Sequence, residues 1–198
     1  MDAQEQEKAY GIGELMGLSA ARAVPVVAGI GDGALAGPTP CAEYDVKGLV
    51  NHLFQVVVEF QKLAVKEDSD FTSTPDRVGR GADWRERFAG EAQALVAAWS
   101  APGAEDGVSG AMKMPARLVG AMALLDLTVH AWDLARATGQ AYEVAPQVVG
   151  PLADAVAELG PTAKEMGVFG APVEVGEQAP PFFRLLAATG RDPYVAVP

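Results

Sequence analysis

The chain has 198 residues, which suits one domain and is short for two full ones. It carries 26 acidic and 15 basic side chains, and the formal net charge of -11 argues against a nucleic-acid partner, which needs clustered Lys and Arg. No apolar run reaches the roughly 18 residues of a membrane span, and residues 1–8 lack the pattern of a signal peptide. We therefore expect a cytoplasmic protein without a membrane partner.

Cys41 is the single cysteine of the chain, which excludes a disulfide within the chain and a thiolate-rich zinc cluster. A metal ion in this protein would have to be held by His, Asp or Glu side chains. Cys41 could act as a nucleophile, but a small apolar side chain beside Pro40 is more often a packing residue.

Apolar residues recur with a period near 3.6 in several segments, which predicts helices. The first covers residues 5–30, although Pro25 should kink or end it. After a loop rich in Gly and Pro, Asp45 suits the N-cap of a second helix over residues 46–65, because its carboxylate can accept hydrogen bonds from the first turn. A charged connection then leads to a third helix over residues 82–99.

The helical pattern continues in the second half of the chain. Residues 118–137 predict an unusually apolar and deeply buried fourth helix, and Gly139 suits the left-handed position after its last turn. A fifth helix is expected over residues 146–159, and residues 180–189 add a further turn or two.

Strict alternation of apolar and polar residues is confined to residues 107–114 and 171–175, which is too little for a large sheet. The sequence therefore predicts an all-α bundle. We expect one domain over residues 1–198, divided into a core over residues 5–140 and a C-terminal extension over residues 141–198.

His52 and His130 are the two histidines of the chain, and each falls inside a predicted core helix. Burying an imidazole costs free energy unless its nitrogens find partners, so a buried histidine is normally hydrogen-bonded or bound to a metal. Taken singly, each of the two is more often a satisfied core histidine than a ligand.

Asp126 changes this balance, because it lies four residues before His130 on the same helix face and inside an apolar run. An ionised carboxylate there must be paired, bound to metal or protonated. A solvent-facing Asp126–His130 pair is one alternative. The other is a metal site of His52, Asp126 and His130, built as helix bundles build carboxylate–histidine sites.

Three protein ligands would leave coordination positions open, as in catalytic rather than structural metal sites. Imidazole and carboxylate suit zinc, nickel and iron(II) alike, and zinc is our first choice on availability. Asp133, three residues after His130, is a candidate to accept the other ring N–H of that histidine, although a carboxylate on the helix surface is the more common case.

Three segments carry a resemblance to a known family. Residues 39–46, followed by Leu49 and Asn51-His52-Leu53, resemble the second-helix signature of actinobacterial proteins related to mycothiol-dependent maleylpyruvate isomerase. Residues 126–135 resemble the metal-binding helix of that family, and residues 185–193 resemble the ending of one uncharacterised branch.

The resemblance implies a DinB-like four-helix bundle with a short, mostly helical C-terminal extension and a divalent metal held by three side chains. His52 matches the ligand on the second helix and His130 the last ligand on the fourth. Asp126 stands where the isomerase has a glutamate, so its carboxylate reaches less far. The chain has no room for the larger C-terminal domain of the isomerase, and the substrate of the isomerase is therefore not inherited.

Two functions stay open at this stage. The characterised members of the family use a low-molecular-weight thiol, which implies a metal-dependent transferase or isomerase acting with mycothiol or a similar thiol on a small electrophile. The alternative is a non-catalytic metal- or ligand-binding bundle with a structural or sensing role. Arg191 could contact the carboxylate of a thiol cofactor or lie solvated in the tail. The catalytic residues are unknown, and a homodimer is left open.

Overall fold

The computed structural model of the protein describes residues 9–111, 113–165 and 168–194. Its α-helices are α1 Ile12–Ala28, α2 Val46–Ala64, α3 Trp84–Ser100, α4 Ala116–Ala137, α5 Pro146–Glu165 and α6 Pro181–Ala188. Two 3-10 helices, η1 Asp32–Ala34 and η2 Val78–Arg80, and an antiparallel pair of two-residue strands, β1 Val108–Ser109 and β2 Met114–Pro115, make up the rest of the described regular structure. The fold class is all-α, as the sequence predicts.

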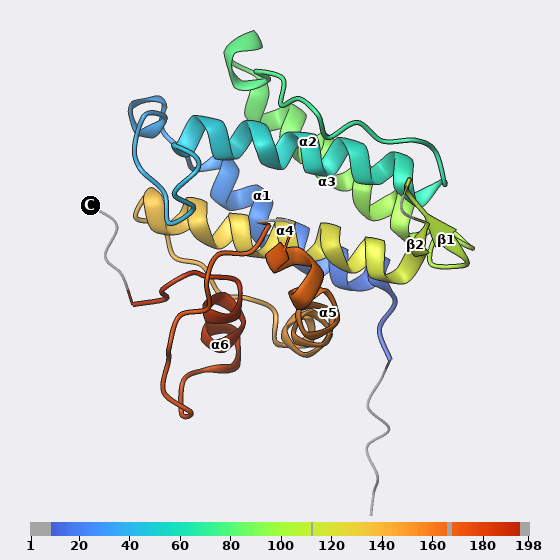
Figure 1. Cartoon of the computed structure of the whole chain (residues 1–198). Coiled ribbons are helices and arrows are strands. Elements are labelled where there is room, and N and C mark those ends of the chain that lie inside the picture. The colour runs from blue at the N-terminus through green and yellow to red at the C-terminus, as the bar shows by residue number, and fades with distance from the viewer. Residues whose placement is uncertain (1–8, 112, 166–167, 195–198) are drawn as a thin grey trace, which may run out of the picture.

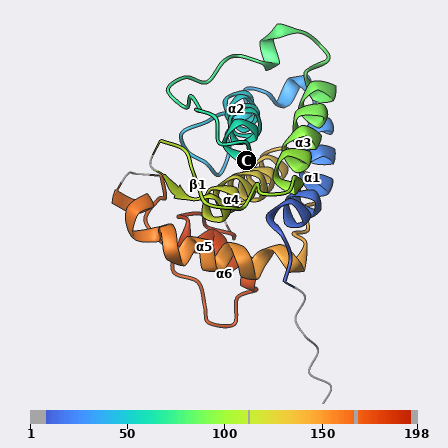
Figure 2. The same ribbon diagram turned by 90° about the vertical axis from the view of Figure 1, so that its right-hand side faces the viewer.

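Helices α1 to α4 pack around one core (Figure 1). Both α1 and α2 contact α3 and α4, while α5 packs on α4 and α1 and α6 packs on α5. Figures 1 and 2 show α5 and α6 on the side of α4 that faces away from α2. Because α4 is covered on both sides, it is the central helix of the fold.

The apolar composition of α4 follows from this central place. Among the described helices, α4 alone is long and apolar enough to cross a membrane. In its most apolar stretch of 18 residues, 83% is buried inside the fold. Core helices of soluble proteins show the same composition, because every face of such a helix meets other apolar side chains. The prediction of an unusually buried fourth helix is therefore confirmed.

Small and polar side chains fix how α4 meets its neighbours. Gly120 lies so close to α1 and α3 that a Cβ atom there would be 2.7 Å from Ile12 Cγ2 and 2.8 Å from Trp99 Cε3. The hydroxyls of Ser19 and Thr128 lie 2.8 Å apart and share a buried hydrogen bond between α1 and α4. These contacts set the distances between helices, whereas apolar burial supplies most of the stability.

The start of the first helix differs from the prediction. Residues 5–8 lie outside the described residues, and α1 begins at Ile12 instead of residue 5. The Glu105 carboxylate accepts a hydrogen bond from the Ile12 backbone N–H at 2.7 Å, and Glu14 accepts from Gly11 at 3.1 Å. The helix therefore starts where carboxylates satisfy its free N–H groups, one of them from a segment 93 residues away.

Pro25 does not end α1, which continues to Ala28. The Gly29 N–H still reaches the Pro25 carbonyl at 2.9 Å, and Pro25 lies on the exposed face of the helix. Because the ring and the missing N–H face solvent, water can pair with the carbonyl that the proline leaves free.

The other helices match the predictions more closely. Asp45 is the N-cap of α2, and its Oδ1 accepts from the Gly48 N–H at 2.6 Å. Gly139 follows α4 with φ +66°, as predicted. The fifth helix was expected to end at residue 159 but extends to Glu165, and of the two alternating fragments, only residues 107–114 contribute to a strand pair. The division into core and extension stays a prediction.

The connection between α2 and α3 is fixed to a polar stripe on α2, which consists of Asn51, Gln55 and Glu59. Asn51 Oδ1 accepts from the backbone N–H groups of Arg77 and Val78 at 2.8 and 3.0 Å. Gln55 donates to the Asp70 carbonyl at 2.7 Å, and Glu59 accepts from the Asp70 N–H at 2.8 Å. The stripe follows helical spacing, so one face of α2 holds the connection at Asp70 and at Arg77 and Val78.

Candidate metal centre

The two histidines meet between α2 and α4. The rings of His52 and His130 lie edge to face with centroids 5.0 Å apart. Asp126, one turn before His130 on α4, places its Oδ1 3.8 Å from His130 Nε2. One ligand atom from each of the three side chains lies within 4.8 Å of the other two. The structure thus brings together the three residues that the sequence selects as metal ligands.

This geometry fits the donor set of a divalent ion. The 3.8 Å between His130 and Asp126 is too long for a hydrogen bond, and it is shorter than the sum of two metal–ligand bonds of about 2.1 Å each. One ion can therefore contact both atoms with small movements of the side chains. Two imidazoles and one carboxylate suit zinc, nickel and iron(II). Metal ligation itself stays a prediction.

The second nitrogen of His130 is held by Asp133. Nδ1 of His130 lies 3.0 Å from Asp133 Oδ2, and the Asp133 side chain is fully buried. Because the carboxylate accepts hydrogen bonds only, it favours the ring tautomer with the proton on Nδ1 and the lone pair on Nε2, the nitrogen that faces Asp126. The expectation that Asp133 supports His130 agrees with this contact, and the alternative of a surface carboxylate is wrong.

Arg191 lies against the same carboxylate. Its Nε lies 3.0 Å from Asp133 Oδ2 and 3.2 Å from Oδ1, and only 12% of its side chain is exposed. A solvated tail residue is therefore excluded for Arg191. The sequence could not show this pair, because 58 positions separate the two residues and no local spacing links them.

A cavity of about 300 Å³ opens over the three candidate ligands. Its wall includes Cys41 and Tyr44 from the segment before α2, and Phe169, Thr189 and Arg191 from the C-terminal part of the chain. The volume lies at the lower end of the usual range for small-molecule sites. The position beside the ligands is accessible to a small molecule of mixed polarity.

Burial and neighbouring charges shift the acid–base groups of this cavity. Burial lowers the pKa of His52 below its usual value, and the Asp126 carboxylate partly offsets this effect. The ring of Tyr44 stacks on His52 with centroids 5.1 Å apart, and burial raises the pKa of its phenol. A neutral imidazole is the form that binds metal, so the burial of His52 favours ligation.

A second group of potential ligands consists of Cys41, His130 and Asp133, whose ligand atoms also lie within 4.8 Å of one another. Burial raises the pKa of the Cys41 thiol, which keeps it in the form that binds metal poorly. Asp133 already pairs with Arg191 and His130. The group of His52, Asp126 and His130 is therefore the better candidate for a metal site.

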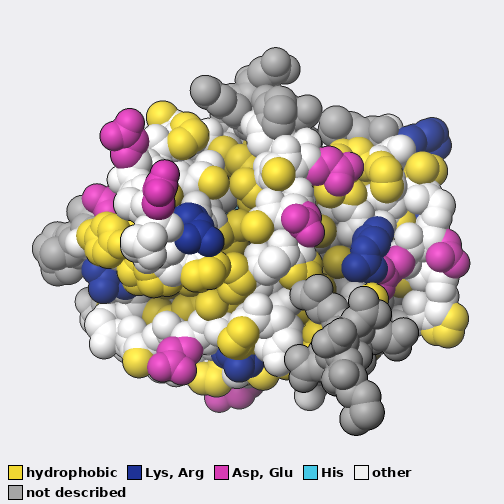
Figure 3. Space-filling model, turned by 90° about the horizontal axis from the view of Figure 1, so that it is seen from below, with side chains coloured by type: hydrophobic (Ala, Val, Ile, Leu, Met, Phe, Trp, Pro, Cys, Tyr) yellow, Lys and Arg dark blue, Asp and Glu magenta, His cyan; other side chains and the backbone are white. Residues whose placement is uncertain are grey.

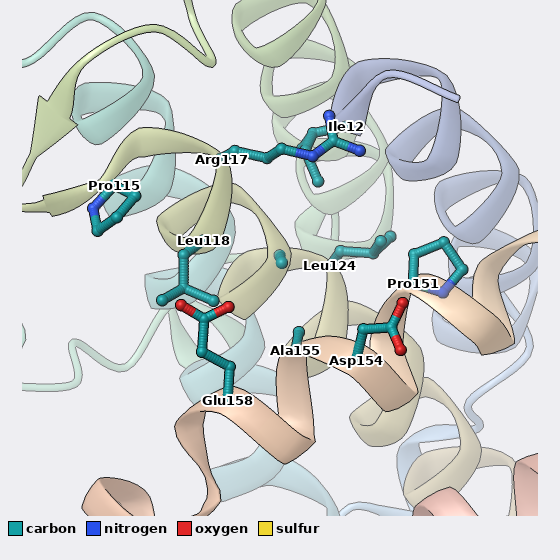
Figure 4. A pocket seen from close by; sticks show the side chains of 10 residues that line it. Ile12, Pro115, Arg117, Leu118, Leu124, Pro151, Asp154, Ala155 and Glu158 are labelled. Atoms are coloured by element: carbon teal, nitrogen blue, oxygen red, sulfur yellow. The ribbon is translucent and has the colours of Figure 1, made fainter. Parts of the chain in front are cut away.

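Two other cavities lack this chemistry. One of about 350 Å³ lies between α4 and α5, where Figure 4 shows Arg117 on one side and Asp154 and Glu158 on the other. The larger one, about 780 Å³, is a mainly apolar groove between α5 and α6, and Figure 3 shows hydrophobic side chains gathered in this face. In the described part of the chain neither is lined by His or Cys.

Sequence reasoning missed several residues of the cavity. Tyr44 belongs to the segment that carries the resemblance, yet its stacking on His52 was not expected. Phe169 and Thr189 come from the C-terminal part of the chain, where no helical periodicity links them to the histidines. Tyr44 lies two residues before Val46, the first residue of α2, and this closeness to the helix that carries His52 was the one local signal for Tyr44.

Comparison with known families decides the relationship. Residues 17–135 match the model of the mycothiol maleylpyruvate isomerase N-terminal domain, which covers more than half of the chain, including His52, Asp126, His130 and Asp133. The chain belongs to the mycothiol maleylpyruvate isomerase N-terminal domain family. The match ends before α5, so the family model does not cover Arg191.

Two relatives with similar sequences are uncharacterised proteins. An uncharacterised protein of Mycobacterium tuberculosis strain CDC 1551 / Oshkosh is 31% identical over 166 residues, which cover 79% of this chain and 85% of the relative. An uncharacterised protein of strain ATCC 25618 / H37Rv shows the same identity and coverage. No solved structure matches the chain. Membership is thus shown at the level of the family, and activity has to be inferred from the site.

Proposed function

We propose that the protein binds one divalent metal ion through His52, Asp126 and His130 and uses a small thiol, mycothiol or a close analogue, in transfer to or isomerisation of a small electrophile. The observation that carries the proposal is the convergence of three ligand atoms within 4.8 Å at the wall of a small cavity. Membership of a mycothiol-related family supports the choice of thiol. We place this activity in the cytoplasm and take zinc as the first candidate ion.

The side chains of the site have separate roles in this proposal. His52 and His130 supply neutral nitrogen donors and Asp126 supplies the charge that favours a cation. When bound, the ion would lower the pKa of a coordinated thiol and so supply a thiolate nucleophile. The cavity beside Tyr44 and Phe169 would hold the rest of the thiol and exclude part of the water. The general base, if one is needed, is not assigned.

The first test is metal content. We expect about one equivalent of divalent metal in the purified protein, and we expect His52→Ala and His130→Ala each to lose most of it, because two remaining ligands compete poorly with water and buffer. Elemental analysis measures this directly. Asp126→Glu should retain the ion, since it restores the carboxylate found in the isomerase. Full occupancy in either histidine variant would contradict the proposed ligand set.

The second measurement separates an enzyme from a binding protein. Titration of the cobalt-substituted protein with mycothiol should add a sulfur-to-metal charge-transfer band and release about one proton per site, because the metal stabilises the deprotonated sulfur. If millimolar thiol changes neither the spectrum nor the pH, the ion has a structural or sensing role instead.

A further inference from the structure

We propose that Arg191 is a positioning residue of the candidate metal centre, which acts through Asp133 to fix the ring of His130 and thereby couples the docking of residues 189–194 to metal binding. The inference rests on the proposed metal site. It extends that site to a segment outside the region matched by the family model, which ends at residue 135.

The backbone after α6 delivers Arg191 to this place. The Gly190 N–H donates to the Ala187 carbonyl at 3.1 Å and the Arg191 N–H to the Leu186 carbonyl at 3.0 Å, which together form a Schellman motif. Gly190 adopts φ +88°, and a Cβ atom there would lie 2.6 Å from Gly170 Cα. Glycine is therefore required at this turn, and the turn directs Arg191 back toward α4.

Arg191 and Asp133 form a buried ion pair. Nε of Arg191 contacts both carboxylate oxygens, while its Nη1 lies 3.3 Å from the Thr189 carbonyl oxygen and 3.4 Å from the Thr189 hydroxyl. A fully buried carboxylate is costly without a cation, and among the described residues Arg191 is the cation that contacts Asp133. Arg191 therefore keeps Asp133 available as an acceptor.

Asp133 passes this effect to His130. Each carboxylate oxygen of Asp133 contacts Arg191, and Oδ2 also lies 3.0 Å from His130 Nδ1. With the carboxylate anchored, the ring keeps its proton on Nδ1 and directs Nε2 toward Asp126 and His52. Coupling of this kind is reciprocal: a bound ion that holds the His130 ring also favours the docked position of residues 189–194.

The test compares Arg191→Met with Arg184→Met. Arg184 is an exposed arginine on α6 whose Nη1 donates to the Ala179 and Glu177 carbonyls, so its loss removes an arginine without touching Asp133. Nitrogen-15 NMR of the metal-free protein, at a pH where the imidazoles are neutral, reports which nitrogen of His130 carries the proton. Competition with a chromophoric chelator gives the zinc affinity.

We expect the wild type and Arg184→Met to show the Nδ1–H form and equal zinc affinity. Arg191→Met should give a mixture of tautomers and a zinc affinity lower by about 10- to 100-fold, the usual effect of losing a residue that supports a metal ligand. Hydrogen exchange of the backbone amides at residues 186–191 should also slow when zinc is added to the wild type and not to Arg191→Met.

Two outcomes would overturn the proposal: a wild-type tautomer and affinity in Arg191→Met, or the same loss in Arg184→Met. If Arg191→Met does not fold, the double variant Asp133→Ala/Arg191→Met removes both the buried charge and the acceptor for His130 Nδ1. Retention of the wild-type tautomer and affinity in that variant would overturn the proposal equally. A wild type that binds no zinc defeats the proposed function and, with it, the coupling of residues 189–194 to metal. The tautomer of the metal-free protein still tests separately whether Arg191 fixes the ring of His130.

Discussion

Individual side chains at the site differ in how tightly their neighbours hold them. His130 is buried, and its Nδ1 faces Asp133, whereas His52 is partly exposed and is stacked on Tyr44. A ring held by a hydrogen bond has a fixed orientation, but a stacked ring can still slide and rotate in its plane. We infer that His130 sets the position of a bound ion and that His52 adjusts to it.

Asp76 provides the clearest pH dependence at the level of one residue. Its carboxylate accepts hydrogen bonds from Lys47 Nζ, the Gly79 N–H and Asn51 Nδ2, and the Lys47 contact above all lowers its pKa from 3.8 to about 2. A pKa below the unfolded value means that the stabilising effect is complete above pH 3.8 and is lost as the pH falls toward 2.

We expect Asp76→Asn to lower the urea midpoint of unfolding slightly at pH 6 and much less at pH 2.5, because the wild-type carboxyl is itself partly protonated at the lower pH. Urea titrations at the two pH values, followed by circular dichroism, measure the difference. Asp68→Asn, on an exposed part of the same connection, is the matched control. A gap between wild type and Asp76→Asn that is independent of pH would contradict this account.

At the scale of elements, α2 has two neighbouring polar positions with separate tasks. Asn51 accepts hydrogen bonds from two backbone N–H groups of the connection after α2, and His52, the next residue, belongs to the candidate metal centre. Successive helical residues lie about 100° apart around the axis, so one helix can hold the connection on one face and a ligand on the next.

Asn51→Ala should therefore change the stability of the protein, and His52→Ala its metal content. Asn51→Ala leaves the N–H groups of Arg77 and Val78 without a partner and should destabilise the protein by about 2 kcal/mol, since an unpaired buried polar group costs about 1–3 kcal/mol. It should keep the metal. His52→Ala should lose the metal and leave the stability of the metal-free protein nearly unchanged. Chemical denaturation and elemental analysis of both variants check the two effects, and loss of metal in Asn51→Ala would show that the two faces are coupled.

At the scale of the whole molecule, Gly120 controls how closely α4 meets α1 and α3. Alanine usually stabilises a helix interior relative to glycine by about 0.5–1 kcal/mol. At Gly120 the added methyl group would overlap Ile12 and the Trp99 ring, and overpacking of a core costs about 1–3 kcal/mol. The sign of the effect should therefore reverse.

We expect Gly120→Ala to lower the melting temperature and Gly150→Ala to raise it. Gly150 lies in α5 with open space around its missing side chain, so alanine there meets no neighbour. Differential scanning calorimetry of the two variants compares the same substitution in two helices of one protein. Stabilisation by Gly120→Ala would mean that α4 can move away from α1 and α3 without a loss of stability.

Much of the fold could be predicted because its signals are local. The apolar stripes of α2, α3 and α4, the Asp45 cap and the glycine after α4 depend on residues within one or two turns. The Asp126–His130 pair is local in the same sense. The predicted start of α1 was wrong, because Glu105, from a distant segment, helps to determine where the helix begins.

The pairing of Asp133 with Arg191 and the stacking of Tyr44 on His52 could not be predicted in the same way. Each depends on the packing of separate segments, and no spacing within the sequence encodes the distance between them. The candidate metal ligands could be selected because residue chemistry limits the choice: with two histidines in the chain, a histidine-based site has few alternatives. The residues that support a candidate ligand cannot be selected in this way, because many acidic and basic side chains of the chain could take that role.

The Asp133–Arg191 pair also has a consequence for the nascent chain. Asp133 lies in the central helix, whereas Arg191 is translated 58 residues later, a delay of about 3–12 s at about 5–20 residues per second. During that interval the helices can collapse, but closing the core would enclose a carboxylate whose cation has not yet been synthesised. We therefore expect α4 to stay loosely packed and accessible to chaperones until the turn after α6 leaves the ribosome.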